Sequence, residues 1–325
     1  MVALALAVAC GGVATSSEAS APTAASVEPS TLPILRHVRT GPGPIGITAA
    51  FGSIWVVNSE FRVHERGSVT RIDPANGSVL ATIRVGGVPL EVTAAARSIW
   101  VSNSDDSSVS RIDPATNAVV ATIHVCRAPE GLAGTPGSVW IVCEDDDAVG
   151  RIDPVTERMT GTVDVGLSPR FVLAAFGSLW VSSFVEGSIS RIDPVAGKAI
   201  ATIEVESGPQ LMLATPDGIW VSNTDAPAVQ RIDPQTNAVV ATLEDVGTTP
   251  DGLVELDGAV WVASDSGPQI HRIEPADGSV RGPWPVADQG SISANQSLAA
   301  VDGTFWVPLF NQDEVVQIEP PESRP

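Results

Sequence analysis

Residues 89–125 read PLEVTAAARSIWVSNSDDSSVSRIDPATNAVVATIHV, and variants of this stretch recur along most of the 325-residue chain. Most copies keep three markers: a proline, a tryptophan eleven residues later, and Arg-Ile-Asp-Pro or a close relative after a further eleven residues. The tryptophans that mark the copies are Trp55, Trp100, Trp140, Trp180, Trp220, Trp261 and Trp306. Self-similarity at a period of about 40 residues is typical of a repeat architecture.

One copy divides into four short segments rich in Val, Ile, Thr and Trp, with turn residues between them. We expect strands at residues 90–95, 98–103, 108–113 and 118–125. These residue types suit a pleated, half-buried surface, and Asp113 before Pro114 predicts an Asx turn between the last two strands. Four antiparallel strands per repeat is typical of a β-propeller blade. Trp284 is out of register, in a proline-flanked segment that we expect to be irregular.

The two ends of the repeat array predict a closed ring. The seventh copy ends soon after residues 317–320 and lacks a fourth strand, whereas residues 34–39 resemble an extra fourth strand before the first copy. Pairing them would remove an unpaired sheet edge. The sequence therefore predicts an all-β, seven-bladed propeller over residues 34–320, followed by a tail at 321–325. An open β-solenoid, the alternative fold, would not need the extra strand.

The first 33 residues predict an export signal and a tether. Residues 1–9 are mostly apolar, and the small residues before Cys10 resemble the lipobox of bacterial lipoproteins, in which that cysteine carries the lipid. Residues 10–33 are rich in Ser, Thr, Ala and Pro, which favours a flexible tether. We expect membrane contact only through the lipid anchor, outside the cytoplasm. A plain secretory signal, giving a secreted protein, is the alternative.

Charge and composition narrow the expected partners. Lys and Arg total 18 against 38 Asp and Glu, a net charge of −20 at pH 7. Phosphate backbones would be repelled, so we expect no nucleic acid partner. The sequence contains no run of about 20 apolar residues, so it predicts no transmembrane helix. We expect a monomer.

Two cysteines predict a disulfide. Cys126 precedes the first strand of the third copy and Cys143 ends its second strand. Because these strands are antiparallel, the two cysteines would face each other at one end of the blade. Two unlinked buried thiols are the alternative. A disulfide needs an oxidising compartment, which agrees with export.

Candidate binding residues fall on one face, here called the top face, where the loops before the first strand and after the second strand open. The residue after the marker proline lies there at the channel mouth and varies among the copies, although one residue type could serve throughout. The polar members, which we expect to bind a ligand, are Glu130, Arg170, Gln210, Asp251 and, after Asn295, Gln296. The alternative interpretation is that these residues are solvated at the channel mouth and bind no ligand.

Two insertions also fall on the top face, one in the first copy and one before the seventh. Blades one and seven are neighbours in a closed ring, so the insertions should meet, and binding residues concentrate on such loops. The candidates there are Phe61, Arg62, His64, Asp288 and Gln289. Acidic residues are numerous in the top-face loops, which predicts attraction of a cation or basic partner, or else a solvated acidic rim.

The repeat Pro-x-Gly…Gly-Ser-x-Trp-Val-x-Asn…Arg-Ile-Asp-Pro-x-Thr-Asn resembles the YVTN-type repeats of bacterial propellers. It is also similar to the virginiamycin B lyase (streptogramin lyase) family, over roughly residues 34–320. The resemblance implies a propeller in which a Mg²⁺ site and channel-facing His and Glu residues open cyclic streptogramins by elimination. Glu130 holds a mouth position here, but no mouth position holds a histidine.

The sequence leaves two functions open. No hydrolase, metalloprotease or phosphate-loop motif appears, so we assign no catalytic residue and predict no cofactor. We expect a surface-anchored binding or scaffold module for an unknown small molecule or protein. The alternative is a lyase of the streptogramin type, or a lactonase-like hydrolase, with its site in the channel and Mg²⁺ or Ca²⁺ as its metal.

Overall fold

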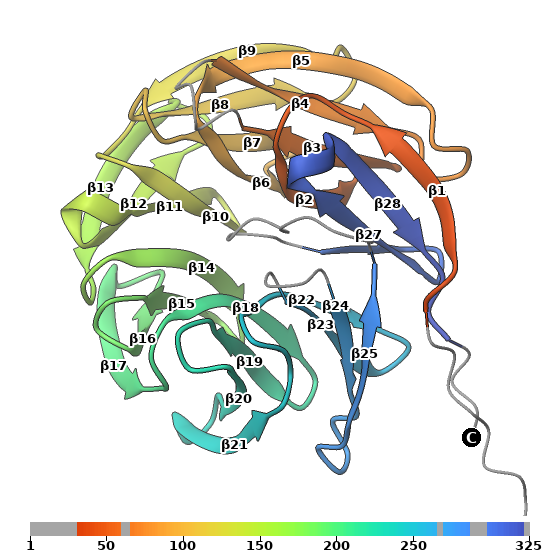
Figure 1. The fold of residues 1–325 in the computed structure, drawn as a ribbon. Coiled ribbons are helices and arrows are strands. Elements are labelled where there is room, and N and C mark those ends of the chain that lie inside the picture. Colours follow the sequence, from red (N-terminus) through yellow and green to blue (C-terminus); the bar gives the residue numbers. More distant parts are fainter. Residues whose placement is uncertain (1–30, 60–65, 265–268, 287–297, 322–325) are drawn as a thin grey trace, which may run out of the picture.

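The computed structural model describes residues 31–59, 66–264, 269–286 and 298–321. They form seven four-stranded antiparallel sheets arranged as blades around a central axis (Figure 1). The seven-bladed propeller predicted from the sequence is therefore confirmed. Within these ranges, no helix is long and apolar enough to cross a membrane.

Each blade runs from an inner strand beside the axis to an outer strand at the rim (Figure 1). The inner strands are β2 (Pro44–Ala50), β6 (Pro89–Ala95), β10 (Pro129–Thr135), β14 (Pro169–Ala175), β18 (Pro209–Thr215), β22 (Pro250–Leu256) and β26 (Ala299–Val301). The second strands are β3 (Ser53–Asn58), β7 (Ser98–Asn103), β11 (Ser138–Cys143), β15 (Ser178–Ser183), β19 (Gly218–Asn223), β23 (Ala259–Ser264) and β27 (Thr304–Leu309). The third strands are β4 (Arg66–Ile72), β8 (Ser108–Asp113), β12 (Ala148–Asp153), β16 (Ser188–Asp193), β20 (Ala228–Asp233), β24 (Gln269–Ile273) and β28 (Glu314–Ile318).

The outer strands are β5 (Val79–Gly87), β9 (Ala118–His124), β13 (Arg158–Asp164), β17 (Lys198–Glu204), β21 (Ala238–Glu244), β25 (Val280–Pro285) and β1 (Ile34–Arg39). Two 3-10 turns, η1 (Glu144–Asp146) and η2 (Phe310–Gln312), follow the second strands of blades three and seven. Blades are numbered from β2, so blade seven comprises β26, β27, β28 and β1. Strand ends match the sequence prediction to within one residue in the second copy.

The N-terminal strand closes the ring as predicted. β1 pairs antiparallel with β28, with Val38 opposite Val315. The third strand of blade seven has Gln317 where most blades have the motif arginine, and Arg36 from β1 supplies the missing guanidinium. Arg36 donates to the side chain of Gln317 and to the carbonyls of Pro74 and Ala75 in blade one. The closing strand thus joins blade seven to blade one through side chains as well as through the sheet.

The motif Arg-Ile-Asp-Pro joins consecutive blades. In blade two, Nε of Arg111 donates to Ser98 Oγ at 2.9 Å, its guanidinium lies 5.5 Å from the Trp100 ring centroid, and its Nη1 donates to the Pro154 carbonyl of blade three at 3.0 Å. The motif aspartate forms the predicted Asx turn, since Asp113 Oδ1 accepts from the Ala115 amide at 2.8 Å. The repeated motif is therefore accounted for by structure rather than by ligand binding.

The seven marker tryptophans form the packing between blades. Each is at most 2% exposed and shares an apolar cluster with residues of the following blade. Trp180 of blade four, for example, packs in one cluster with Met212 and Ile219 of blade five. The hydrophobic core is thus divided into a ring of blade-to-blade contacts.

The expectation for Trp284 is wrong. It lies in β25, the outer strand of blade six, opposite Ile270 of β24, and is 2% exposed. Its ring centroid is 5.8 Å from that of Trp261. Flanking prolines are tolerated because an outer strand has one edge that needs no ladder hydrogen bonds.

Candidate functional site

A β-bulge at the start of the inner strands aims side chains at the channel. In β10, Pro129 pairs with Cys143, but pairing resumes only at Leu132, which leaves Glu130 and Gly131 out of register. Similar shifts follow the first proline of the other long inner strands. Bulges re-aim side chains and are common beside functional sites. The variable position identified in the sequence is therefore a bulge position at the channel.

Four of the five predicted mouth residues lie in described strands, on four consecutive blades. Glu130 and Gln210 are each 6% exposed and Asp251 is fully buried. Arg170, Glu130 and Gln210 line one small pocket together with Glu91. Ile45 and Leu90 hold the same position in blades one and two, so the fold itself does not require polar side chains there.

Arg170 links the carboxyl groups of two residues of blade three. Its Nη1 donates to Glu130 Oε1 at 2.8 Å and its Nη2 lies 2.9 Å from Glu144 Oε1. Ser168 Oγ donates to the same Glu144 oxygen at 3.1 Å, and the guanidinium lies 5.3 Å from the Phe184 ring centroid. Glu144 and Arg170 are 23% and 26% exposed, so a ligand above the mouth could reach them.

Glu91 belongs to this site, although the sequence analysis did not single it out. It occupies the second bulge position of β6, where blades one and three have Gly46 and Gly131. A Cβ on Gly131 would lie 2.8 Å from the Arg170 carbonyl oxygen, so neighbouring inner strands approach closely there. The other long inner strands have glycine, phenylalanine or leucine at this position, so the glutamate was the signal that could have identified it.

Two carboxyl groups of the site hold their protons unusually tightly. Burial raises the pKa of Glu91 to about 8; a hydrogen bond from the Val92 amide lowers it and the charge of Asp251 raises it further. Burial likewise raises the pKa of Glu130 to about 8, opposed by Arg170 and reinforced by Glu144. A cation that entered the site would favour the charged forms of both groups.

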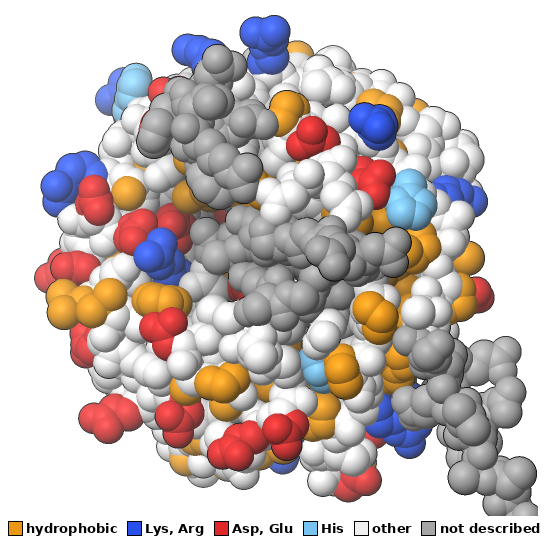
Figure 2. All heavy atoms as spheres, viewed as in Figure 1, with side chains coloured by type: hydrophobic (Ala, Val, Ile, Leu, Met, Phe, Trp, Pro, Cys, Tyr) orange, Lys and Arg blue, Asp and Glu red, His pale blue; other side chains and the backbone are white. Residues whose placement is uncertain are grey.

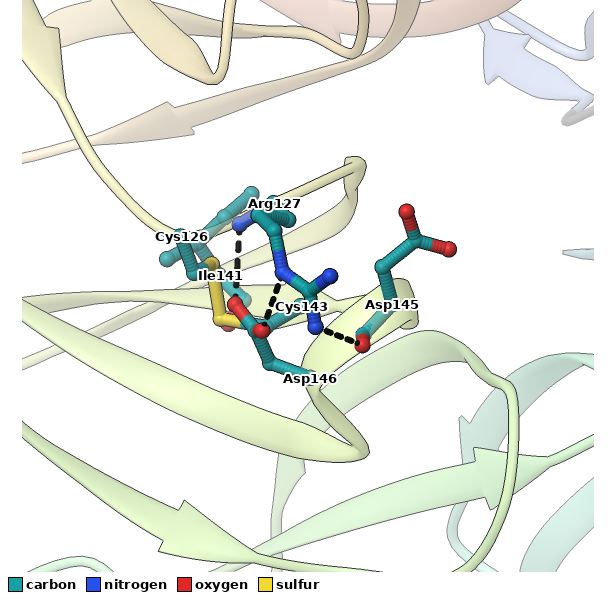
Figure 3. The surroundings of a disulfide bond; sticks show 6 residues. All are labelled: Cys126, Arg127, Ile141, Cys143, Asp145 and Asp146. Carbon is teal, nitrogen blue, oxygen red and sulfur yellow. Dashed lines mark hydrogen bonds and ion pairs between the residues drawn. A yellow bond between two sulfur atoms is a disulfide. The ribbon is translucent and has the colours of Figure 1, made fainter.

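The predicted disulfide is confirmed, and it holds the turn that carries Glu144. Cys126 and Cys143 are bonded, with their Cα atoms 5.5 Å apart. Cys143 immediately precedes η1 (Figure 3). Arg127 Nε lies 2.7 Å from Asp146 Oδ1, and the Asp146 carboxylate also accepts from the Arg127 amide. The disulfide and this ion pair together fix the top of blade three.

We expect reduction of this disulfide to lower the free energy of unfolding by about 3 kcal/mol, because it closes a loop of 17 residues. Denaturant unfolding of the Cys10→Ser chain, with and without reductant, measures the loss. Thiol titration of the same unfolded chain should find no thiols before reduction and two afterwards. Two thiols before reduction would contradict the disulfide.

Several top-face acids have structural roles. They accept backbone amides of the connections that enter a blade: Asp106 from Gly87, Asp146 from Arg127, Glu186 from Leu167 and Asp313 from Gly43, at 2.8 to 3.1 Å. Each of these bonds ties a loop after a second strand to a neighbouring connection. The acidic rim therefore serves the fold as well as setting the sign of the surface charge.

The channel pocket itself is small. It has a volume of about 20 Å³, room for about one water molecule, so a larger ligand would contact the mouth rather than the interior. In the part of the chain that the structure describes, no group of three or more His, Cys, Asp or Glu side chains is placed to hold a metal ion. The described residues thus offer no ligand set for the Mg²⁺ site implied by the resemblance, and we derive no metal-dependent step.

The remaining candidates lie elsewhere. Phe61, Arg62, His64, Asp288, Gln289, Gln296 and Cys10 are outside the described residues. Of the other histidines, His37 and His124 are on outer strands and His271 is on β24. The described channel lining thus contains carboxyl, guanidinium and amide groups but no imidazole.

Comparison with known proteins supports the fold. A solved structure described as "Streptogramin B lyase structure" matches with a TM-score of 0.75 and 16% identity, over 87% of this chain and 96% of that one. The chain has the fold of a streptogramin B lyase. A hydrazine synthase from Kuenenia stuttgartiensis matches almost as well, with a TM-score of 0.74 and 17% identity, over 88% of this chain and 98% of that one. No protein-family model and no curated protein matches the sequence. The neighbours' different names agree with the rule that a fold does not fix an activity.

Proposed function

We propose that this propeller is a binding module whose channel mouth receives a positively charged group, such as an arginine side chain, of a partner protein. The observation that carries the proposal is the ion pair of the partly exposed Glu144 with Arg170 at the mouth, beside the buried carboxyl groups of Glu130 and Glu91 that line the same channel pocket. Burying carboxyl groups costs free energy unless they are paired. The apolar residues at the same position in blades one and two show that the fold can do without them.

The negative charge of the protein favours a basic partner. Glu91 and Glu130, with pKa values of about 8, are mostly protonated at pH 7, so the Glu144 carboxylate supplies negative charge at the mouth, and the whole chain carries a net charge of −20. Such a field attracts basic groups and repels acidic ones. Glu144 and Arg170 are the partly exposed members. An incoming guanidinium would therefore meet the Glu144 carboxylate first, and its charge would favour ionisation of the buried Glu130 and Glu91 behind it.

A pair of matched peptides tests this proposal. Acetyl-Gly-Gly-Arg-Gly-Gly-amide is compared with the same peptide carrying citrulline, the neutral isostere of arginine, by NMR titration. The arginine peptide should bind at least about fivefold more tightly, because one charge-assisted contact contributes about 1 kcal/mol. Glu144→Gln should abolish this preference. Equal affinity of the two peptides would contradict the proposal.

Glu255→Gln is the control for nonspecific attraction to the acidic chain. Glu255 is exposed near the opposite end of β22, away from the mouth, and the substitution removes the same charge. It should leave the affinity for the arginine peptide unchanged within about twofold. Equal loss from Glu144→Gln and Glu255→Gln would mean that only net charge attracts the peptide.

A lyase is the second candidate, because the channel holds two carboxyl groups with a pKa of about 8 and the fold is that of a streptogramin B lyase. Carboxyls tuned close to neutral pH suit general acid–base chemistry. Incubation with a cyclic streptogramin and Mg²⁺, followed by chromatography with mass detection, tests it. Elimination would open the ring without a change of mass, whereas hydrolysis would add one water. The binding function predicts neither product.

We further propose that the protein works outside the cytoplasm, held by a lipid on Cys10. The disulfide supports this location, because disulfides persist in oxidising compartments. Metabolic labelling of the producing cells with a clickable fatty acid should label the wild-type chain and not Cys10→Ser. Labelling of both chains equally, or of neither, would contradict the anchor.

A further inference from the structure

A second cavity lies away from the channel, between blades five and six. It has a volume of about 660 Å³ and shares no lining residue with the channel pocket. Cavities of this size accommodate small organic ligands. Its described lining comes from the connections between β17 and β18 and between β19 and β20, from β20 and β21, from the connection to β22, and from β24 and β25. The cavity is therefore a separate place for a ligand, and the inference below does not depend on the proposed function of the channel mouth.

The connection between β21 and β22, which lines this cavity, contains one residue more than the equivalent connection of the preceding blade. Five residues lie between Glu244 and Pro250, whereas four lie between Glu204 and Pro209 in the preceding blade. The longer connection turns through Gly247 with φ of +103°. A Cβ on Gly247 would lie 2.4 Å from the Ser264 Cβ. Only glycine fits a left-handed backbone lying this close to its neighbour.

His271 lies under this connection, at a position where blades two and five have a hydrogen-bonded polar pair. In blades two and five, the residue at this position of the third strand, Ser110 or Gln230, accepts a hydrogen bond from an asparagine of the second strand. Blade six has Ser264 and His271 instead. His271 lines the cavity and is 3% exposed, and its Nδ1 finds no hydrogen-bond partner among the described residues.

A buried nitrogen that lacks a hydrogen-bond partner lowers the stability of the fold. Burial lowers the pKa of His271, so the ring is neutral at pH 7 and one of its nitrogens can accept a hydrogen bond. The neutral ring adds no positive charge to the cavity. Its Nδ1 has less than 1 Å² of accessible surface, so an amine would have to displace the connection around Gly247 to donate a hydrogen bond there.

The other lining groups favour a ligand that combines a positive charge with an apolar part. The carboxyl groups are those of Glu206, Glu244 and Asp245, and the described lining contains no lysine or arginine. Acidic side chains gather at this edge of the molecule, over β17, β20 and β21 (Figure 2). Pro227 and Pro283 contribute apolar surface. We propose that this cavity binds a small organic ammonium ion, with its charge toward the three carboxyls and its hydrocarbon part against the two prolines.

Benzylamine and benzyl alcohol, which differ mainly in charge, are the probes. Ligand-observed NMR with the whole chain should find one benzylamine site with a dissociation constant of about 1 mM. Benzyl alcohol should bind at least about tenfold more weakly. Equal binding of the two probes, or no binding of benzylamine at 10-fold higher concentration, on the order of 10 mM, would overturn the proposal.

Matched variants locate the site. Glu244→Gln should weaken benzylamine binding about fivefold, whereas Glu204→Gln, at the same register position of β17 and with the same charge change, should leave it unchanged. His271→Gln introduces the residue that blade five has at this position, so the fold has a precedent for it, and it should weaken binding similarly. Equal effects of the Glu244 and Glu204 substitutions would overturn the assignment.

The Glu144→Gln variant distinguishes binding in this cavity from binding at the channel mouth. It should leave benzylamine binding unchanged while abolishing the preference for the arginine peptide. Loss of benzylamine binding in Glu144→Gln would place the amine at the mouth and overturn the proposal for the second cavity. Failure of the peptide experiment alone would count against the proposed function and leave the cavity site standing.

Discussion

Replacing Trp180 with alanine should lower the free energy of unfolding by about 3–5 kcal/mol, which is the usual loss when a buried tryptophan or phenylalanine is replaced by alanine. The ring is fully buried, its Nε1 donates to the Ala175 carbonyl at 3.1 Å, and the Arg191 guanidinium lies 4.7 Å from its centroid. The substitution would open a cavity between blades four and five and leave that guanidinium without its aromatic partner. Denaturant unfolding followed by circular dichroism measures the loss.

Val195→Ala provides the matched control in the same blade. Val195 is 90% exposed in the turn between β16 and β17, and removal of an exposed side chain there should change stability by less than about 0.5 kcal/mol. A Trp180→Ala effect no larger than that of Val195→Ala would show that the marker tryptophans do not hold the blades together.

The second large effect is a loss of stability as the pH rises. The folded chain holds a proton on Glu91 up to a pKa of about 8, whereas the ordinary pKa of a glutamate, as in the unfolded chain, is 4.5. The stability contributed by that proton is complete below pH 4.5 and is lost as the pH rises through 8. Linkage gives a loss of about 4 kcal/mol between pH 5 and pH 9 for this one group.

Glu91→Gln isolates this contribution from the rest of the acidic chain. Glutamine keeps the shape and cannot titrate, so the unfolding free energy of the variant should fall less steeply with pH than that of the wild type, and the two curves should diverge above pH 5. Glu255→Gln, which removes an exposed carboxyl, should follow the wild-type curve. Parallel curves for the wild type and Glu91→Gln would mean that Glu91 ionises normally in the folded state.

Periodicity was sufficient to predict the blades. The three markers fixed the strand boundaries, the ring closure by residues 34–39 and the side of the blade on which Cys126 and Cys143 meet. These features follow from strand order and alternation, which depend on local sequence. Trp284 is the exception, because its flanking prolines favour an irregular segment, whereas an outer strand tolerates them.

Contacts between blades could not be predicted in the same way. The period shows that Gln317 departs from the motif, but only packing shows that Arg36 takes over the guanidinium position. Glu91 and His271 likewise differ from their equivalents in other blades. Their significance depends on the bulge and on a connection longer by one residue, which place them beside groups far away in the sequence.

A crystal structure of the protein with the arginine peptide tests the central claim most directly. The account predicts the peptide guanidinium at the channel mouth, within hydrogen-bond distance of the Glu144 carboxylate and beside Arg170. A guanidinium bound at the outer rim, with the mouth contacts of Arg170 unchanged and no peptide near Glu144, would contradict the assignment of the mouth as the binding site.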